Sequence, residues 1–232
     1  METIVEIFSN LTNPEWIMQN GGLYFVLLIV FIETGIFFGF FLPGDPLLFI
    51  SGMIIANTLD PFSLPVANLF FWILLIATSG IIGNYVGYWF GRKSERFLLQ
   101  RKDNWLFKKK YIAQSKEFYD KRGGGAIVLA RFLPLIRTFA PIVAGMVKMN
   151  MVKFSFYNIL GSLLWSGTIV SAGFLLGENA WAKDHLEKII LGIVLITTGP
   201  VLLKLVLGKK KSNLQMPPVF GIPTKGIIRN SK

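Results

Sequence analysis

The sequence of 232 residues contains no cysteine and only one histidine. The absence of cysteine excludes disulfide bonds and thiol chemistry. A lone histidine cannot supply the bases of a histidine-dependent phosphatase, and we expect His185 to be a solvated loop residue. The chain also has no Gly-rich P-loop to hold the phosphates of ATP. We therefore predict a protein that is not an enzyme and that uses no cofactor or metal.

Charged residues are scarce in three long stretches of the chain, at 21–91, 123–147 and 154–177. Apolar stretches of this length are typical of a membrane protein that crosses the bilayer several times. The mean hydropathy of +0.54 agrees with that interpretation. The N-terminus carries acids where a signal peptide has basic residues, so we expect it to be retained.

The net charge of +11 comes from two basic regions, the segment 92–122 and the C-terminal end of the chain. Basic residues beside membrane spans indicate the cytoplasmic side, so we expect both regions, including the C-terminus, in the cytoplasm. Aromatic residues among the lysines of 92–122 favour a helix lying on the membrane surface. We expect these regions to contact anionic lipid and not nucleic acid.

Apolar runs and helix-breaking residues divide the chain into segments. Together these segments predict an all-α membrane protein that crosses the bilayer several times. The expected segments are a surface segment at 1–20, a re-entrant hairpin at 21–56, a span at 67–91, the amphipathic cytoplasmic segment at 92–122, a second re-entrant hairpin at 123–150, spans at 154–177 and 189–207, and a flexible basic tail at 208–232. Residues 21–207 are expected to form a single membrane domain.

Prolines and glycines interrupt both expected hairpins. In the first, the apolar run 47–56 is about half of the ~20 residues that cross a bilayer. The residues expected to break the hairpins are Pro43, Gly44, Pro134, Pro141 and Gly145. Chain reversal at such breaks predicts hairpins that enter and leave the same side of the membrane.

The two halves of the chain resemble each other. "FLP" occurs at 41–43 and at 132–134, followed in each half by another proline and a small residue before "GM". Chance similarity between apolar sequences is the alternative. The positive-inside topology places the two hairpins in opposite leaflets, an inverted repeat used by secondary transporters. We also expect Gly83, Gly87 and Gly91, which lie one helical turn apart, to admit a close helix neighbour.

Four ionisable residues fall within the expected hairpins: Glu33, Asp45, Arg131 and Arg137. Each costs at least ~2.5–3.5 kcal/mol at the bilayer centre, so each needs a partner or a polar cavity. One interpretation is a pair of structural ion pairs between the hairpins. The other is a site in which the permanently charged arginines bind phosphate and a carboxylate changes its charge.

At these residues the sequence resembles the DedA family, also called the VTT or SNARE-associated domain family. The resemblance rests on Glu33 followed by "PGD" ending at Asp45, on "GNYVGYWFG" at 83–91 and on "ARFLPLIRTFAPIVAGM" at 130–146. It covers about 20–207. It implies a bacterial inner-membrane protein with opposed re-entrant hairpins, in which the arginines handle a phosphate and the acids couple to protons.

Family members are linked to lipid translocation, notably of undecaprenyl phosphate, and the resemblance implies the same class of activity here. We expect Arg131, Arg137 and Thr138 to bind the lipid phosphate, and Glu33 and Asp45 to bind a proton or monovalent cation. The alternatives are a phosphatidylethanolamine flippase or scramblase, a proton-coupled transporter of small ions or solutes, and a structural membrane scaffold. The sequence is compatible with a homo-oligomer.

Overall fold

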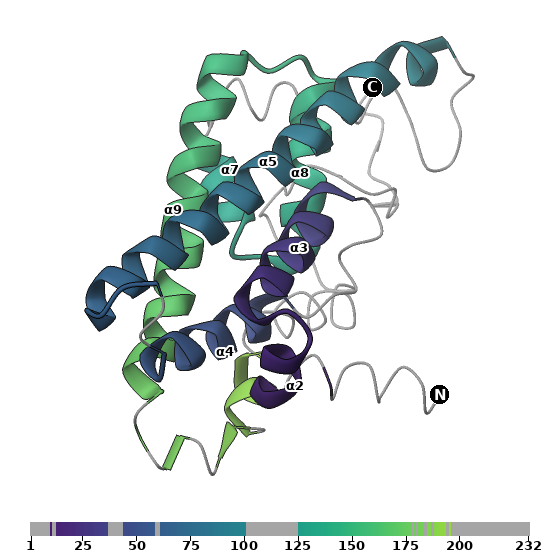
Figure 1. The fold of residues 1–232 in the computed structure, drawn as a ribbon. Coiled ribbons are helices and arrows are strands. Elements are labelled where there is room, and N and C mark those ends of the chain that lie inside the picture. Colours follow the sequence, from purple (N-terminus) through teal and green to yellow (C-terminus); the bar gives the residue numbers. More distant parts are fainter. Residues whose placement is uncertain are drawn as a thin grey trace, which may run out of the picture.

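The computed structural model describes residue 10 and residues 13–36, 44–58, 61–100, 125–177, 179, 181–182, 185–186, 188–193 and 195. Every regular element in these parts of the chain is a helix, and no strand occurs among them (Figure 1). Several expected features lie outside the described residues: Pro43, residues 101–122 of the cytoplasmic segment, most of the 189–207 span and the tail 208–232.

The first half begins with α2 (Pro14–Gln19) and α3 (Gly22–Gly35). Gly21, between them, has a φ of 110°, a backbone conformation that residues with a Cβ rarely adopt. Although the apolar run extends to residue 41, α3 already ends at Gly35. The interruption of the first expected hairpin therefore starts before its prolines.

Helix α4 (Gly44–Ala56) begins at one of the expected breaking residues. Pro46 lies in its first turn, where the N–H that proline lacks has no intrahelical partner in any case. All of its residues except the last are buried. The helix is therefore enclosed by its neighbours.

Two long helices, α5 (Pro65–Gln100) and α9 (Met151–Leu176), carry apolar stretches long enough to cross a membrane. Only 33% of the most apolar window of each is buried within the molecule, so most of these side chains face outward. The core helix of a soluble protein would bury them. Helix α5 also continues through Gly91, where its span was expected to end, into the basic segment.

In the second half, α7 (Gly125–Ala130) and α8 (Pro134–Met146) are separated by the turn 131–133. Pro134 starts α8, as expected of a break. The prediction that Pro141 and Gly145 also break the helix is wrong, because α8 runs through both residues. A proline removes only one bond of the helical ladder, and apolar helices held by neighbours tolerate that loss.

Each of two short helices packs against a long helix from the other half of the chain: α4 contacts α9, and α8 contacts α5 (Figure 1). Both contacts depend on glycine. A Cβ at Gly52 would overlap the carbonyl of Val170, and a Cβ at Gly145 would overlap that of Tyr88. The two halves thus make equivalent backbone contacts with each other.

Two of the three glycines expected to admit a neighbour lie at further close approaches of α5. A Cβ at Gly83 would overlap Thr34 of α3, and one at Gly91 would overlap the carbonyl of Ile142 in α8. A Cβ at Gly87 would make only ordinary contacts with Pro141 and Ile142. Helix α5 is therefore the common support for α3 and α8.

Candidate functional site

The four ionisable residues expected at the site are all buried. Glu33 at the end of α3 and Asp45 at the start of α4 have exposed fractions of 1% and 5%. Arg131 in the turn before α8 and Arg137 in its first half have exposed fractions of 2% and 4%. All four therefore lie where three helix ends meet in the interior of the bundle.

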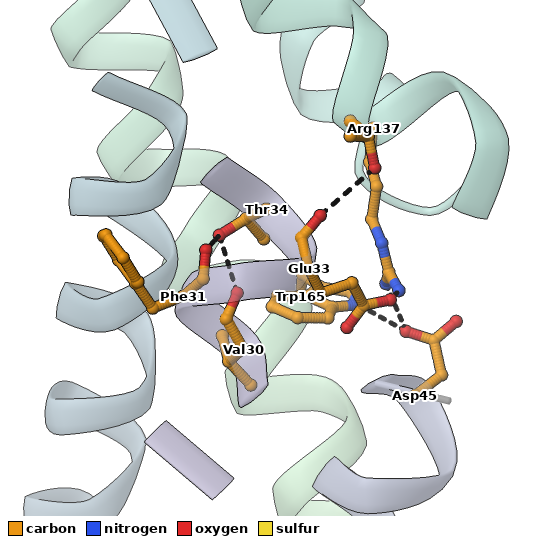
Figure 2. Close-up of polar contacts among 8 residues, drawn as sticks. Val30, Phe31, Glu33, Thr34, Asp45, Arg137 and Trp165 are labelled. Carbon is orange, nitrogen blue, oxygen red and sulfur yellow. Dashed lines mark hydrogen bonds and ion pairs between the residues drawn. The ribbon is translucent and has the colours of Figure 1, made fainter. Parts of the chain in front are cut away.

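Arg137 joins the two acids. Its Nη1 donates to Oδ1 of Asp45 at 2.5 Å, and its Nη2 forms an ion pair with Oε1 of Glu33. Figure 2 shows the guanidinium pointing toward both carboxylates. The next residue, Thr138, donates from its hydroxyl to the backbone carbonyl of Glu33 at 3.3 Å. These contacts tie α8 to α3 and α4.

Arg131 has a different environment. Its Nη2 donates to Oδ1 of Asn158 in α9 at 2.7 Å and lies 3.5 Å from the carbonyl oxygen of Gly80 in α5. The Asn158 amide is itself fixed, because Asn84 donates to its Oδ1 at 2.8 Å and its Nδ2 donates to the carbonyl of Ile81 at 3.2 Å. Arg131 is thus held by neutral oxygens.

Trp165 of α9 connects the two arginine environments. Its indole Nε1 donates to Oδ1 of Asp45 at 3.0 Å. The guanidinium carbons of Arg137 and Arg131 lie 4.9 Å and 5.9 Å from its ring centroid, within the range of cation–π attraction. Figure 2 shows the ring beside Arg137 and Asp45. One side chain therefore contacts three of the four charges.

Gly44 provides the space that the Glu33 carboxylate occupies. A Cβ built on Gly44 would overlap that carboxylate directly. The lack of a side chain at Gly44 therefore makes room for the Glu33 carboxylate at the beginning of α4.

Three buried polar atoms of the site have no hydrogen-bond partner among the described residues: Oε2 of Glu33, Nε of Arg131 and Nε of Arg137. Buried polar atoms are nearly always paired in folded proteins. The unpaired carboxylate oxygen is available to accept a proton, and the two unpaired guanidinium nitrogens are available to donate hydrogen bonds to an anion. The arrangement is suited to binding an anion and a proton or cation.

Asn84, Asn158 and Trp165 were not among the residues selected from the sequence. Asn84 and Asn158 are buried amides in long apolar helices, and a buried amide in such a helix requires a polar partner. That was the available signal for both. Trp165 gave none, because a tryptophan in an apolar stretch is equally suited to packing or to the membrane interface.

Comparison with known proteins identifies the family. Residues 42–175 match the VTT domain, a region that includes Asp45 and both arginines, while Glu33 precedes it. The protein DedA of Escherichia coli is 36% identical over 185 residues, which cover 80% of this chain and 82% of that protein. A membrane protein of Mycobacterium leprae is 35% identical over 193 residues, 82% of each chain.

The inner membrane protein YqjA of Escherichia coli is 31% identical over 216 residues, which cover 88% of this chain and 91% of that protein. No solved structure gives a significant match. The identity extends well beyond the matched domain and confirms the family expected from the sequence. The chain belongs to the DedA family of VTT-domain membrane proteins.

Proposed function

We propose that this protein is a translocase that moves a phosphate-bearing lipid across the bacterial inner membrane. Undecaprenyl phosphate is the first candidate for that lipid. The phosphate group binds in the buried site that the arginines form, and Glu33 and Asp45 bind the proton or monovalent cation that accompanies transport.

One observation carries the proposal: two guanidinium groups and two carboxylates are buried together at interrupted helices inside an apolar bundle. Arginine keeps its charge and its planar fork matches the oxygens of phosphate. Burial of such charges is costly, and ion pairs in a protein interior are weak stabilisers beside apolar packing. Binding of a transported phosphate therefore explains the charged cluster better than a contribution to stability does.

The proposed membrane arrangement follows from helix length. Helices α3 and α4 have 14 and 13 residues, shorter than the ~20 needed to cross the hydrocarbon core. We assign α3–α4 and α7–α8 to two re-entrant hairpins that enter from opposite leaflets and meet at the charged cluster. The relative YqjA is named an inner membrane protein, which supports the same location here. The C-terminus and the basic segment then lie in the cytoplasm against anionic lipid.

Transport by purified protein in liposomes tests the proposal. A fluorescent polyprenyl phosphate and a fluorescent phosphatidylethanolamine are followed separately by quenching from outside, and an internal pH dye reports proton movement. Wild type should expose the polyprenyl phosphate, and Arg137→Ala should abolish that exposure. Lys153→Ala, which removes an exposed positive charge at the start of α9, is the matched control.

Each arm separates the alternatives. Movement of phosphatidylethanolamine alone identifies a phospholipid flippase or scramblase. Proton flux without movement of either lipid identifies a transporter of ions or small solutes. Equal exposure of the polyprenyl phosphate by wild type and Arg137→Ala would contradict the assigned site.

A further inference from the structure

The two arginines of the site differ in how their charge is balanced. Arg137 is paired with both carboxylates, Glu33 and Asp45. Among the described residues no carboxylate forms an ion pair with Arg131, whose charged nitrogen meets an amide oxygen and a backbone carbonyl instead. Two carboxylates and one guanidinium leave one net negative charge on one side of the site. Arg131 is a separate positive charge.

The surroundings of Arg131 are shaped to keep it in place without neutralising it. A Cβ at Gly161 of α9 would lie 3.1 Å from its Cδ, and one at Gly80 of α5 would lie 3.4 Å from its Nη1. Gly161 therefore leaves room for the arginine side chain, and Gly80 lies next to its guanidinium group. The Asn158 oxygen is oriented toward it by the bonds that Asn158 makes with Asn84 and Ile81. The positive charge of Arg131 is therefore held in place by neutral groups.

Two further features mark this place as incomplete. Nε of Arg131 is buried and has no partner in the described part of the chain. The turn that carries Arg131 leads directly into α8, where Pro134 has no N–H and the N–H groups of Ile136 and Arg137 already donate to the carbonyl of Leu133. The positive end of the helix dipole favours negative charge at this place. A buried cation with an unused donor, next in sequence to the start of a helix, is suited to an anion.

We propose that the arginines have separate roles: Arg131 is the receptor that contacts the phosphate group, and Arg137 is the counter-ion that holds Glu33 and Asp45. This division rests on the proposed function and specifies which group meets the substrate. The ligand chemistry is a phosphate monoester or free phosphate, because either presents oxygens to a guanidinium fork. Phosphate does not need to displace Glu33 or Asp45 in order to bind.

Asn158→Asp is the sharpest test, because it places a carboxylate at the atom that already accepts from Arg131. The substitution supplies an internal anion and keeps Arg131 itself, while a carboxylate oxygen replaces the Nδ2 that donates to the carbonyl of Ile81. Asn150→Asp is the matched control, since its oxygen caps α9 by accepting from two backbone N–H groups and aspartate caps equally well. It adds the same charge outside the site.

Binding is measured by calorimetry on detergent-solubilised protein with farnesyl phosphate, farnesol and inorganic phosphate as probes. Asn158→Asp should weaken farnesyl phosphate binding about 10- to 100-fold, the range for a lost charge-assisted hydrogen bond. Asn150→Asp should bind as wild type. The triple variant Glu33→Gln, Asp45→Asn, Arg137→Gln should retain binding while losing transport. Thermal unfolding verifies that each variant is folded.

The outcomes separate the two proposals. Wild-type affinity in Asn158→Asp, or loss of binding in the triple variant that equals the loss in Asn158→Asp, overturns the division of roles and leaves the lipid translocase intact. Failure of the wild type to bind farnesyl phosphate overturns both. Equal binding of inorganic phosphate with the same variant pattern supports Arg131 as the receptor and overturns a lipid as its source.

Discussion

Trp165 is the residue on which the charged site depends most broadly, although it carries no charge. Its indole N–H donates to Asp45, and both guanidinium groups lie over its ring. A tryptophan ring attracts cations while its N–H satisfies an anion. It therefore stabilises both signs of charge in the buried interior of the bundle.

Trp165→Phe should reduce lipid transport by about tenfold or more, because it removes a hydrogen bond to a carboxylate and keeps an aromatic ring. Trp165→Leu, which also removes the ring, should reduce transport further. Trp181→Phe is the control, since Trp181 is 60% exposed and stacks on His185 away from the site. Liposome transport rates measure the effect. Equal rates for Trp165→Phe and wild type would contradict the assigned role.

Gly44→Ala should impair transport and lower the melting temperature, because the added Cβ overlaps the carboxylate of Glu33. A lower melting temperature would be informative, since replacing glycine by alanine normally stabilises a helix by about 1 kcal/mol. Gly125→Ala, where nothing lies within 4 Å of the added atom, serves as the comparison. An unaltered transport rate in Gly44→Ala would show that Glu33 can move without loss of function.

The sequence was sufficient to select the four charges, because charge in an apolar segment is rare and costly. It did not reveal how they pair. Balance between two acids and two arginines is compatible with one pair each, whereas Arg137 takes both acids. The unequal pairing depends on Asn158, which supports Arg131 from a helix that is distant in sequence. Such support is a property of the packed structure.

At the scale of elements, the notable contacts are backbone-to-backbone crossings at glycine. Gly52 of α4 meets α9, and Gly145 of α8 meets α5. The sequence predicted close packing at the glycines of α5 but took Gly145 for a break. A glycine in an apolar run is compatible with a helix break and with a close helix crossing. Only the position of the neighbouring helix in the folded structure distinguishes the two.

Gly52→Ala and Gly145→Ala should each lower stability by about 1–3 kcal/mol, the usual cost of overpacking. In each case the added Cβ would meet a backbone carbonyl, which cannot rotate away as a side chain can. Gly167→Ala is the control, because the space around Gly167 is open. Thermal unfolding in detergent measures the difference. Equal melting temperatures for all three variants would contradict tight crossings.

At the scale of the whole molecule, the absence of cysteine allows the proposed topology to be tested by labelling. Ser63 in the α4–α5 connection and Lys148 in the α8–α9 connection are both exposed. In the proposed arrangement Ser63 lies outside the cell and Lys148 lies in the cytoplasm. Each introduced cysteine would be the only thiol in the chain.

Ser63→Cys should react with a membrane-impermeant maleimide in intact spheroplasts, and Lys148→Cys should react only after permeabilisation. The physical reason is that, in the proposed arrangement, α5 crosses the bilayer once and the α7–α8 hairpin returns to the side from which it entered, so the connections before α5 and α9 lie on opposite sides. Wild type, which has no thiol, gives the background. Labelling of both positions from the same side would rule out opposed hairpins.

The crossed packing has a consequence for biosynthesis. Because α4 rests on α9, the glycine face of α4 has no partner until the last part of the domain has left the ribosome. The face of α5 that contacts α8 likewise has no partner until α8 has been synthesised. Neither half can mature alone after insertion, so the chain completes its fold only when translation has delivered both. A nascent first half therefore exposes these helix faces until the second half has been inserted, and exposed faces of this kind favour misassembly.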